Sequence, residues 1–403
     1  MASSFAWLDF SDHDRRRAME VIDLFRNEDT RDELGLGVIR DAFADRMFPG
    51  TSTIQTRVRY FLFIPWLFRS LRPRDAGAAR FPQWARQRQN KLREALIDGG
   101  KPLGVIGFRA GKEVQRLPSS VYWSGLRKWG ILRFAGSESA YGRGVTSQGR
   151  GADALRTDDG EPVDPAVGGL WDPALPGPPE DWPEKISFDL THEEARYLAD
   201  RVERIAPNSL LTHLIDQRQD PGTAAFAWEH LRPAQRHAAL GDELLHAQNF
   251  SESMHGAALL YNLMLAEEKQ NEGWINGHKT ALDSWWQNRV ERAKELADWD
   301  RPQFWSLLAG WQARVAPSCR SFVETWLALV NQAGRLEKVK GAECRTLIRA
   351  REQALKGPRA RLGNPSALKY WRGASGNTQL DYRWNSPVCS MLRDLIRGLG
   401  KRA

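Results

Sequence analysis

Hydrophobic residues along this chain recur with the period of an α-helix. Ala18, Val21, Ile22 and Phe25 stand at positions i, i+3, i+4 and i+7, which lie on one face of a helix. No sustained alternation of period two, the pattern of a half-buried strand, occurs between Thr191 and Ala333. The pattern therefore predicts a mainly α, multi-helical protein with few or no strands. Helices are expected over about 11–25, 36–47, 54–65, 84–97, 118–129, 191–205, 242–268, 279–297, 303–316, 321–333, 338–356 and 388–399.

The most apolar stretch of the chain, Tyr60 to Phe68, is too short to cross a membrane. Arg59 and Arg69 bound it and Pro65 interrupts it, whereas a membrane-spanning helix needs about 20 apolar residues. The stretch is therefore predicted to be a buried element. The segment Met1 to Phe10 lacks a basic region followed by a long apolar run, so no secretory signal is expected and a cytoplasmic localisation is favoured.

The length of 403 residues exceeds the size at which one hydrophobic core usually stops growing, so two domains are expected. The composition changes between residues 136 and 189, where 9 Gly and 7 Pro among 54 residues indicate a linker or irregular arm. Seven tryptophans lie between Trp274 and Trp326, and most of them are expected to pack in a helical core. The predicted ranges are a helical amino-terminal domain at 1–135, the linker at 136–189, a Trp-rich helical domain at 190–334 and a basic aromatic region at 335–403.

The basic aromatic region carries nearly all of the excess positive charge. It holds 16 Lys and Arg against 5 Asp and Glu, a net charge of +11, while the whole chain carries +8. Cations displace phosphate counterions and aromatic rings stack on bases, so the region suits nucleic acid, with DNA favoured. The stacking residues are predicted to be Trp371 and Trp384. The predicted phosphate contacts are Arg345, Arg349, Lys356, Arg359, Arg361, Lys369 and Arg372.

Other interpretations of the same region stay open. Arg345, Arg349 and Lys356 share one helical stripe, which could follow a phosphate backbone, but such a stripe is often a solvated face or the dock of an acidic protein. A second possible phosphate site comprises Thr51, Ser52, Thr53 and Arg57, where hydroxyls are expected at a helix start. Ordinary helix capping explains those hydroxyls equally well.

Catalysis has little positive support in the sequence, and no catalytic residue and no cofactor is assigned. Asp32, Glu33, Asp41 and Asp45 could serve a metal-dependent nuclease, but arginines adjoin them and favour salt bridges. The chain also has three cysteines, an odd number too widely spaced for a disulfide framework or a zinc knuckle.

Two Glu-x-x-His elements end at His246 and His255. Their nine-residue offset places them on opposite faces of one helix, so no metal site is predicted. Both histidines are interpreted as hydrogen-bonded packing residues.

Several strings resemble an uncharacterised bacterial family of about 400 residues: Ser4–Phe10, Arg31–Gly35, Phe48–Arg57, Leu117–Ser120 and Asn249–Asn262. The resemblance runs over nearly the whole chain. It implies a gene neighbourhood of anti-phage defence, with helicase and phospholipase-D-like genes nearby, and hence a helicase or nuclease subunit as protein partner. It implies no catalytic residue and no ligand.

The sequence therefore favours a non-enzymatic, DNA-engaging accessory subunit of a bacterial anti-phage defence complex, in which partner proteins do the chemistry. One alternative is a scaffold that docks an acidic protein through the basic tail. A second alternative is a metal-dependent nuclease.

Overall fold

The computed structural model describes residues 32–71, 80–100, 103–144, 169–231 and 240–401. It is mainly α, as predicted: helices follow one another along the described residues, where one isolated bridge between Leu132 and Trp171 is the sole β-type pairing. The expected helix at 11–25 lies outside the described residues. None of the helices in the described ranges has the length and apolar character that crossing a membrane requires.

Contacts between Cα atoms divide the chain into two compact units, each named here after its central helix. The α3 unit comprises residues 43–244 and 381–403, and the α11 unit comprises residues 1–42 and 245–380. Compactness is not independent folding, so the linear domain ranges expected from the sequence stay predictions. Helix α2 (Gly37–Met47) contributes residues to both units.

Helix α3 (Tyr60–Arg69) forms the core of its unit, because every residue from Tyr60 to Phe68 is buried. The prediction of a buried element is confirmed. The indole of Trp129, which follows α5 (Pro118–Lys128), stacks on Phe61 with ring centroids 3.9 Å apart. Helix α3 begins six residues later than expected and continues through Pro65. Residues 51–59 are instead irregular, and Tyr122 of α5 accepts hydrogen bonds from two of their backbone N–H groups.

Helix α19 (Cys389–Leu399) packs on helix α7 (His192–Ile205). Gly398 permits the close approach, since a Cβ there would lie 2.6 Å from the Cβ of Ala195. The start of α7 is fixed by a capping box, in which Glu194 N–H donates to Thr191 Oγ1 (3.1 Å) and Thr191 N–H donates to Glu194 Oε2 (3.0 Å). Both helices agree with the sequence-based expectation.

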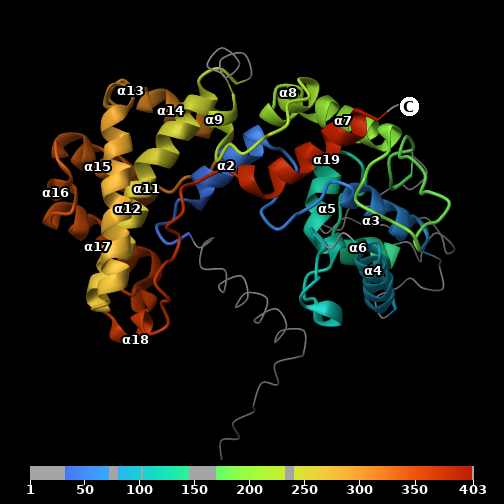
Figure 1. Cartoon of the computed structure of the whole chain (residues 1–403), viewed down its shortest axis with the longest axis horizontal. Coiled ribbons are helices and arrows are strands. Elements are labelled where there is room, and N and C mark those ends of the chain that lie inside the picture. Colours follow the sequence, from blue (N-terminus) through green and yellow to red (C-terminus); the bar gives the residue numbers. More distant parts are fainter. Residues whose placement is uncertain (1–31, 72–79, 101–102, 145–168, 232–239, 402–403) are drawn as a thin grey trace, which may run out of the picture. The chain divides into compact units, whose positions relative to one another are not determined.

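The described part of the Gly- and Pro-rich range comprises residues 136–144, which contain helix α6 (Glu138–Gly144), and residues 169–189, an irregular segment without a helix. It is nevertheless packed, because Trp171, Ile186 and Phe188 are buried. The further helices of the α3 unit are α4 (Phe81–Asp98), η3 (Gly111–Glu113), α6 (Glu138–Gly144), α8 (Leu210–Asp216), α9 (Ala227–His230) and η6 (Trp384–Val388) (Figure 1).

Helix α11 (Glu243–Glu268) is continuous and organises its own unit through tryptophans. The indole N–H groups of Trp285 in α12 (Glu272–Glu291) and Trp326 in α15 (Pro317–Ala333) donate to the carbonyls of Glu252 and Ser253 on α11. Both rings are buried, which confirms the expected tryptophan core. The unit also contains α13 (Ala293–Ala297), α14 (Arg301–Gly310), α16 (Leu336–Val339), α17 (Ala342–Lys356), η5 (Gly357–Arg359) and α18 (Pro365–Leu368) (Figure 1).

The three cysteines are free and buried. Burial raises the pKa of Cys344 and of Cys389 to about 11, so both remain thiols at neutral pH.

Candidate nucleic-acid interface

Helix α17 carries the predicted basic stripe, but two of its arginines are paired within the protein. Arg345 donates to both carboxylate oxygens of Glu267, at 2.5 and 3.0 Å. Arg349 donates to Glu268 at 3.1 Å, and its side chain is 51% exposed. Both carboxylates belong to the last turn of α11. These two arginines of the stripe therefore pair with carboxylates at the end of α11, and their charge is not left for a phosphate backbone.

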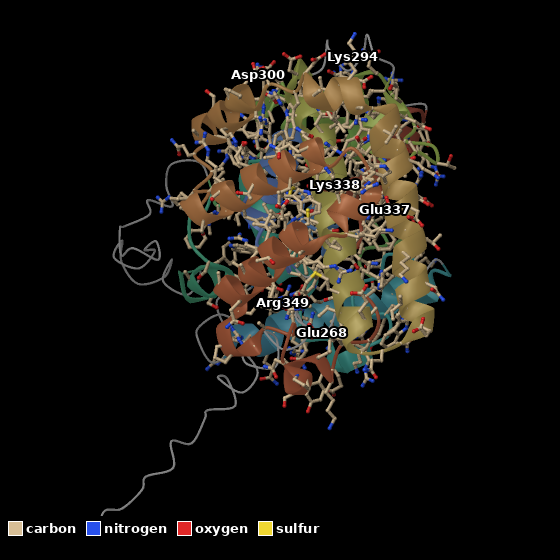
Figure 2. All side chains as sticks on the ribbon, turned by 90° about the vertical axis from the view of Figure 1, so that its left-hand side faces the viewer. Glu268, Lys294, Asp300, Glu337, Lys338 and Arg349 are labelled. Carbon is tan, nitrogen blue, oxygen red and sulfur yellow. The ribbon has the colours of Figure 1, made fainter. Side chains whose placement is uncertain are left out.

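Figure 2 shows that the face around this pair has mixed charge. Arg349 lies close to Glu268, and Lys338 lies close to Glu337. A polyanion is attracted by a surface of one sign, so a face with alternating charges offers it little. The region of highest positive charge in the sequence is thus largely balanced in space.

Lys356 and Arg361 belong to a cluster of paired charges inside the α11 unit. Lys356 Nζ donates to Glu33 and, at 3.0 Å, to Glu352. Arg361 Nη1 donates to Glu33 Oε1 at 2.9 Å, and Tyr261 OH donates to Glu352 Oε1 at 2.5 Å. The cluster holds two cations and two carboxylates, so its formal charge is zero. We call these five residues the Glu33 cluster.

Two backbone N–H groups and one hydroxyl donate further hydrogen bonds to the carboxylates of the Glu33 cluster. The carboxylate of Glu352 accepts the backbone N–H groups of Arg361 and Leu362, each at 3.0 Å. The hydroxyl of Ser375 donates to Glu33. Every carboxylate oxygen in the cluster therefore has a donor, which is the condition under which a buried charge is tolerated. Lys356 and Arg361 are therefore held in ion pairs within the α11 unit. Their prediction as phosphate contacts is wrong, and both are structural residues.

The pKa values of the two carboxyls reflect this environment. Burial acts to raise the pKa of Glu33, but the charges of Lys356 and Arg361 and hydrogen bonds outweigh it, so the net pKa lies below 4.5. Burial likewise acts to raise the pKa of Glu352, and the hydrogen bonds from Tyr261 and the backbone together with Lys356 lower it on balance. Both groups are therefore carboxylates at neutral pH.

These shifts predict a loss of stability in acid. A carboxyl whose pKa is lower in the folded state contributes stability that is fully present above its unfolded pKa, near 4.5, and that is lost as the pH falls through the folded value. We expect the unfolding midpoint in urea to fall steeply below about pH 4.5. Glu33→Gln should be less stable at pH 7 and show a weaker decline, and an equal pH profile for both proteins would contradict the assignment.

Trp371 and Trp384 are buried, and their predicted role in stacking on bases is wrong. Trp371 is 1% exposed and packs edge-on against Trp274 at 5.1 Å. Trp384 is 0% exposed, and its indole N–H donates to the carbonyl of Ala224 at 2.9 Å. A base cannot stack on a ring that is already covered. Both indoles are core residues of their respective units.

The predicted contacts that remain available are Arg359, Lys369 and Arg372. All three are exposed, and their side chains have no ion-pair or hydrogen-bond partner among the described residues. Tyr370, which is not among the predicted stacking residues, is 71% exposed between two of them. We call residues 359–372 the α18 segment. The position of Tyr370 next to Lys369 and two residues before Arg372 was the sequence signal that could have identified it.

The α18 segment is held firmly despite its irregular backbone. Asn364 caps α18, since its side chain accepts from Ala367 N–H at 3.3 Å. Lys269 Nζ donates to the carbonyl of Lys369 at 3.2 Å. Just beyond the segment, His278 contacts the carbonyl of Gly373 at 2.7 Å, and a Cβ at Gly373 would lie 2.7 Å from Trp274. The exposed cations and ring therefore stand on a fixed support.

The second predicted phosphate site is not built as expected. Thr51, Ser52 and Thr53 do not cap a helix, because α3 starts only at Tyr60. Thr51 Oγ1 donates to the carbonyl of Phe48 at 2.7 Å. Arg57 forms two hydrogen bonds with Asp394, at 2.7 and 2.8 Å, so its charge is already paired.

The acidic residues proposed for a nuclease are each engaged elsewhere. The carboxylate of Asp32 accepts backbone N–H groups at the start of α2, Asp41 pairs with Arg40, and Asp45 pairs with Arg383. Glu33 belongs to the cluster described above. Within the described ranges, no group of three or more His, Cys, Asp and Glu side chains could hold a metal ion.

The two histidines of α11 are packing residues, as expected. His246 accepts the indole N–H of Trp299 at 2.8 Å, and His255 Nε2 contacts the carbonyl of Asn377 at 2.9 Å. The helix does not break between them.

These observations define a mainly α-helical protein with a tryptophan-rich core and a small exposed cationic segment. The chain belongs to DUF6361, a family of unknown function whose model matches residues 2–395. The expected membership of an uncharacterised family of about this length is thereby confirmed. No curated protein and no solved structure gives a significant match.

Proposed function

We propose that this chain engages nucleic acid, with DNA favoured, as a non-enzymatic accessory subunit. The observation that carries the proposal is Tyr370, which is 71% exposed and stands beside the exposed cation Lys369. Arg372 and Arg359 extend the positive charge along the α18 segment. An exposed aromatic ring flanked by cations suits a base and its phosphates.

The proposed interface is small, which limits what it can do. Three unpaired cations neutralise at most about three phosphates, so the salt dependence of binding should have a log–log slope of roughly −2 to −3. Contacts to phosphate and stacking on one ring carry little sequence information. Binding is therefore expected to be weak and independent of sequence, as befits a subunit that acts beside a helicase or nuclease partner.

The test is a titration of the full chain with labelled single- and double-stranded DNA at two salt concentrations. Replacing Arg359, Lys369 and Arg372 together with Glu should weaken binding by about tenfold or more at low salt and flatten the salt dependence, because the phosphate contacts are lost. A matched control replaces Lys294, Arg335 and Lys338 with Glu, since these cations are also exposed and change the net charge equally.

Equal affinity of both triple variants would contradict the α18 segment as the interface. The same titration with magnesium separates the proposal from a metal-dependent nuclease, because cleavage of the DNA would overturn the non-enzymatic role. A chain that ignores DNA and binds an acidic protein through the α18 segment would instead support the scaffold alternative.

The proposed setting is a bacterial anti-phage defence complex, and the family resemblance supports it. A plaque assay on cells carrying the gene with its neighbours, in wild-type and triple-variant form, tests this setting. Protection that depends on Arg359, Lys369 and Arg372 is the expected result.

A further inference from the structure

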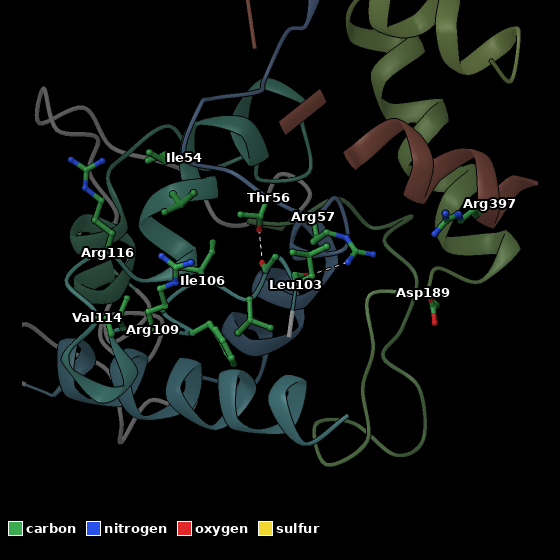
Figure 3. Close-up of a pocket in the computed structure, with 16 residues that line it drawn as sticks. Ile54, Thr56, Arg57, Leu103, Ile106, Arg109, Val114, Arg116, Asp189 and Arg397 are labelled. Atoms are coloured by element: carbon green, nitrogen blue, oxygen red, sulfur yellow. Dashed lines mark hydrogen bonds between the residues drawn. The ribbon is translucent and has the colours of Figure 1, made fainter. Parts of the chain in front are cut away.

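A pocket of about 1010 Å³ opens on the α3 unit, and none of the residues that line it belongs to the proposed DNA interface (Figure 3). Three stretches of chain line it: residues 54–57 before α3, the turn at 103–110, and residues 114–121 leading into α5. Arg397 of α19 and Asp189 of the irregular arm complete the rim. The lining combines apolar side chains with arginines.

The turn at 103–110 is fixed to the body of the unit by hydrogen bonds. Thr56 Oγ1 donates to the carbonyl of Gly104 at 2.7 Å, and Arg57 Nη1 donates to the carbonyl of Leu103 at 3.2 Å (Figure 3). The backbone N–H of Ile106 donates to Tyr60 OH at 3.1 Å. Gly104 has a φ of +90°, and a Cβ there would lie 2.5 Å from Arg57 Cγ. The turn therefore holds one conformation.

This fixed turn presents apolar side chains to water. Leu103 is 84% exposed and Phe108 is 49% exposed, and Ile54, which also lines the pocket, is exposed as well. A firmly held backbone that displays a leucine and a phenylalanine around an apolar hollow is a common arrangement of a docking surface. The apolar floor faces solvent, so a small molecule would stay largely uncovered in it, unlike the ligands of enclosed pockets.

The rim of the pocket is positively charged. The guanidinium groups of Arg109, Arg116 and Arg397 have no ion-pair or hydrogen-bond partner among the described residues, whereas that of Arg57 is neutralised by Asp394. Figure 3 shows Arg109 and Arg116 on one side of the pocket and Arg397 on the other. Among the described residues that line the pocket, Asp189 is the one carboxylate. An occupant should therefore carry apolar residues on one face and carboxylates at its flanks.

We propose that this pocket docks an amphipathic, acidic helix of a partner protein. An α-helix is about 10 Å wide with its side chains, which suits an open hollow of this size. Apolar anchors at i, i+3, i+4 and i+7 would cover Leu103, Phe108 and Ile54, and Asp and Glu on the flanks would pair with the three rim arginines. The aliphatic floor offers one aromatic ring, so a base would find little to stack on.

The experiment pans a displayed library of 16-residue peptides against the full chain and measures the affinity of enriched peptides by fluorescence anisotropy. Enriched peptides should combine apolar residues at helical spacing with several carboxylates. Their binding should fall at least tenfold for Leu103→Ser with Phe108→Ser, and at least tenfold for Arg109→Glu with Arg116→Glu. Replacing the peptide carboxylates with lysine should have the same effect.

Val290→Ser serves as a control, because Val290 is an exposed apolar residue of α12 outside the pocket. The substituted side chains are exposed, except that of Arg116, which is partly buried, so circular dichroism and thermal melting should match the wild type. The proposal is overturned if no acidic amphipathic peptide is enriched, or if such peptides bind the pocket variants as well as the wild type. Loss of duplex DNA affinity in Arg109→Glu with Arg116→Glu, without any peptide binding, would assign the pocket to nucleic acid and also overturn it.

Discussion

Replacing Glu352 with alanine is expected to destabilise the α11 unit by about 3–5 kcal/mol, because it leaves the partly buried cations Lys356 and Arg361 to share the single carboxylate of Glu33. Glu352 is fully buried and accepts from Tyr261, Lys356 and two backbone N–H groups. All four donors would lose an acceptor in the variant. In thermal melting of a unit this size, the loss corresponds to a fall in melting temperature on the order of 10 °C.

Two further variants separate charge from packing. Glu352→Gln keeps the shape but removes the charge, so it should be destabilising to a smaller extent than alanine. Glu352→Leu combined with Lys356→Met removes both charges and should recover part of the loss, since an uncompensated charge no longer stays buried. A melting temperature of Glu352→Ala within about 2 °C of the wild type would contradict the Glu33 cluster as a structural element.

Replacing Trp384 with alanine is expected to cost about 3–5 kcal/mol in the α3 unit while leaving DNA affinity unchanged. The ring is 0% exposed, lies 6.1 Å from the ring of Phe48, and donates to the carbonyl of Ala224. Alanine would create a large cavity and leave that carbonyl without its donor. Urea unfolding monitored by circular dichroism measures the stability, and the DNA titration measures the affinity.

Trp384→Phe is the matched control for this prediction. It retains an aromatic ring and loses the N–H donor, so the destabilisation should be clearly smaller than for alanine. If Trp384→Ala instead folded with wild-type stability and bound DNA more weakly, the ring would be a stacking residue after all.

Local features of the fold could be read from the sequence, because they depend on neighbours in the chain. The capping box at Thr191 and Glu194 uses two residues three positions apart. The helical periods that predict α2, α4 and α19 are equally local. The start of α3 was misplaced because what holds residues 51–59 in an irregular conformation comes from Tyr122 and Asp394, which lie far along the chain.

The candidate site was predicted less well, for a related reason. A cation is available to a ligand only if no carboxylate in the fold reaches it first. The carboxylate that pairs with Arg345 lies 78 positions away and the one that pairs with Arg361 lies 328 positions away. Charge counted along the sequence cannot reveal such pairs. The same holds for Trp371 and Trp384, since a basic sequence neighbourhood does not prevent a ring from being buried.

The Glu33 cluster can form only late in translation, because its residues lie far apart in the chain. Glu33 emerges 342 residues before Ser375 and 328 residues before Arg361, its partners in the cluster. At typical synthesis rates this separation corresponds to roughly 20–70 s. During that interval the early glutamate has none of these partners, so the α11 unit cannot close until translation is nearly finished. The pace of translation and the maturation of this unit are therefore coupled.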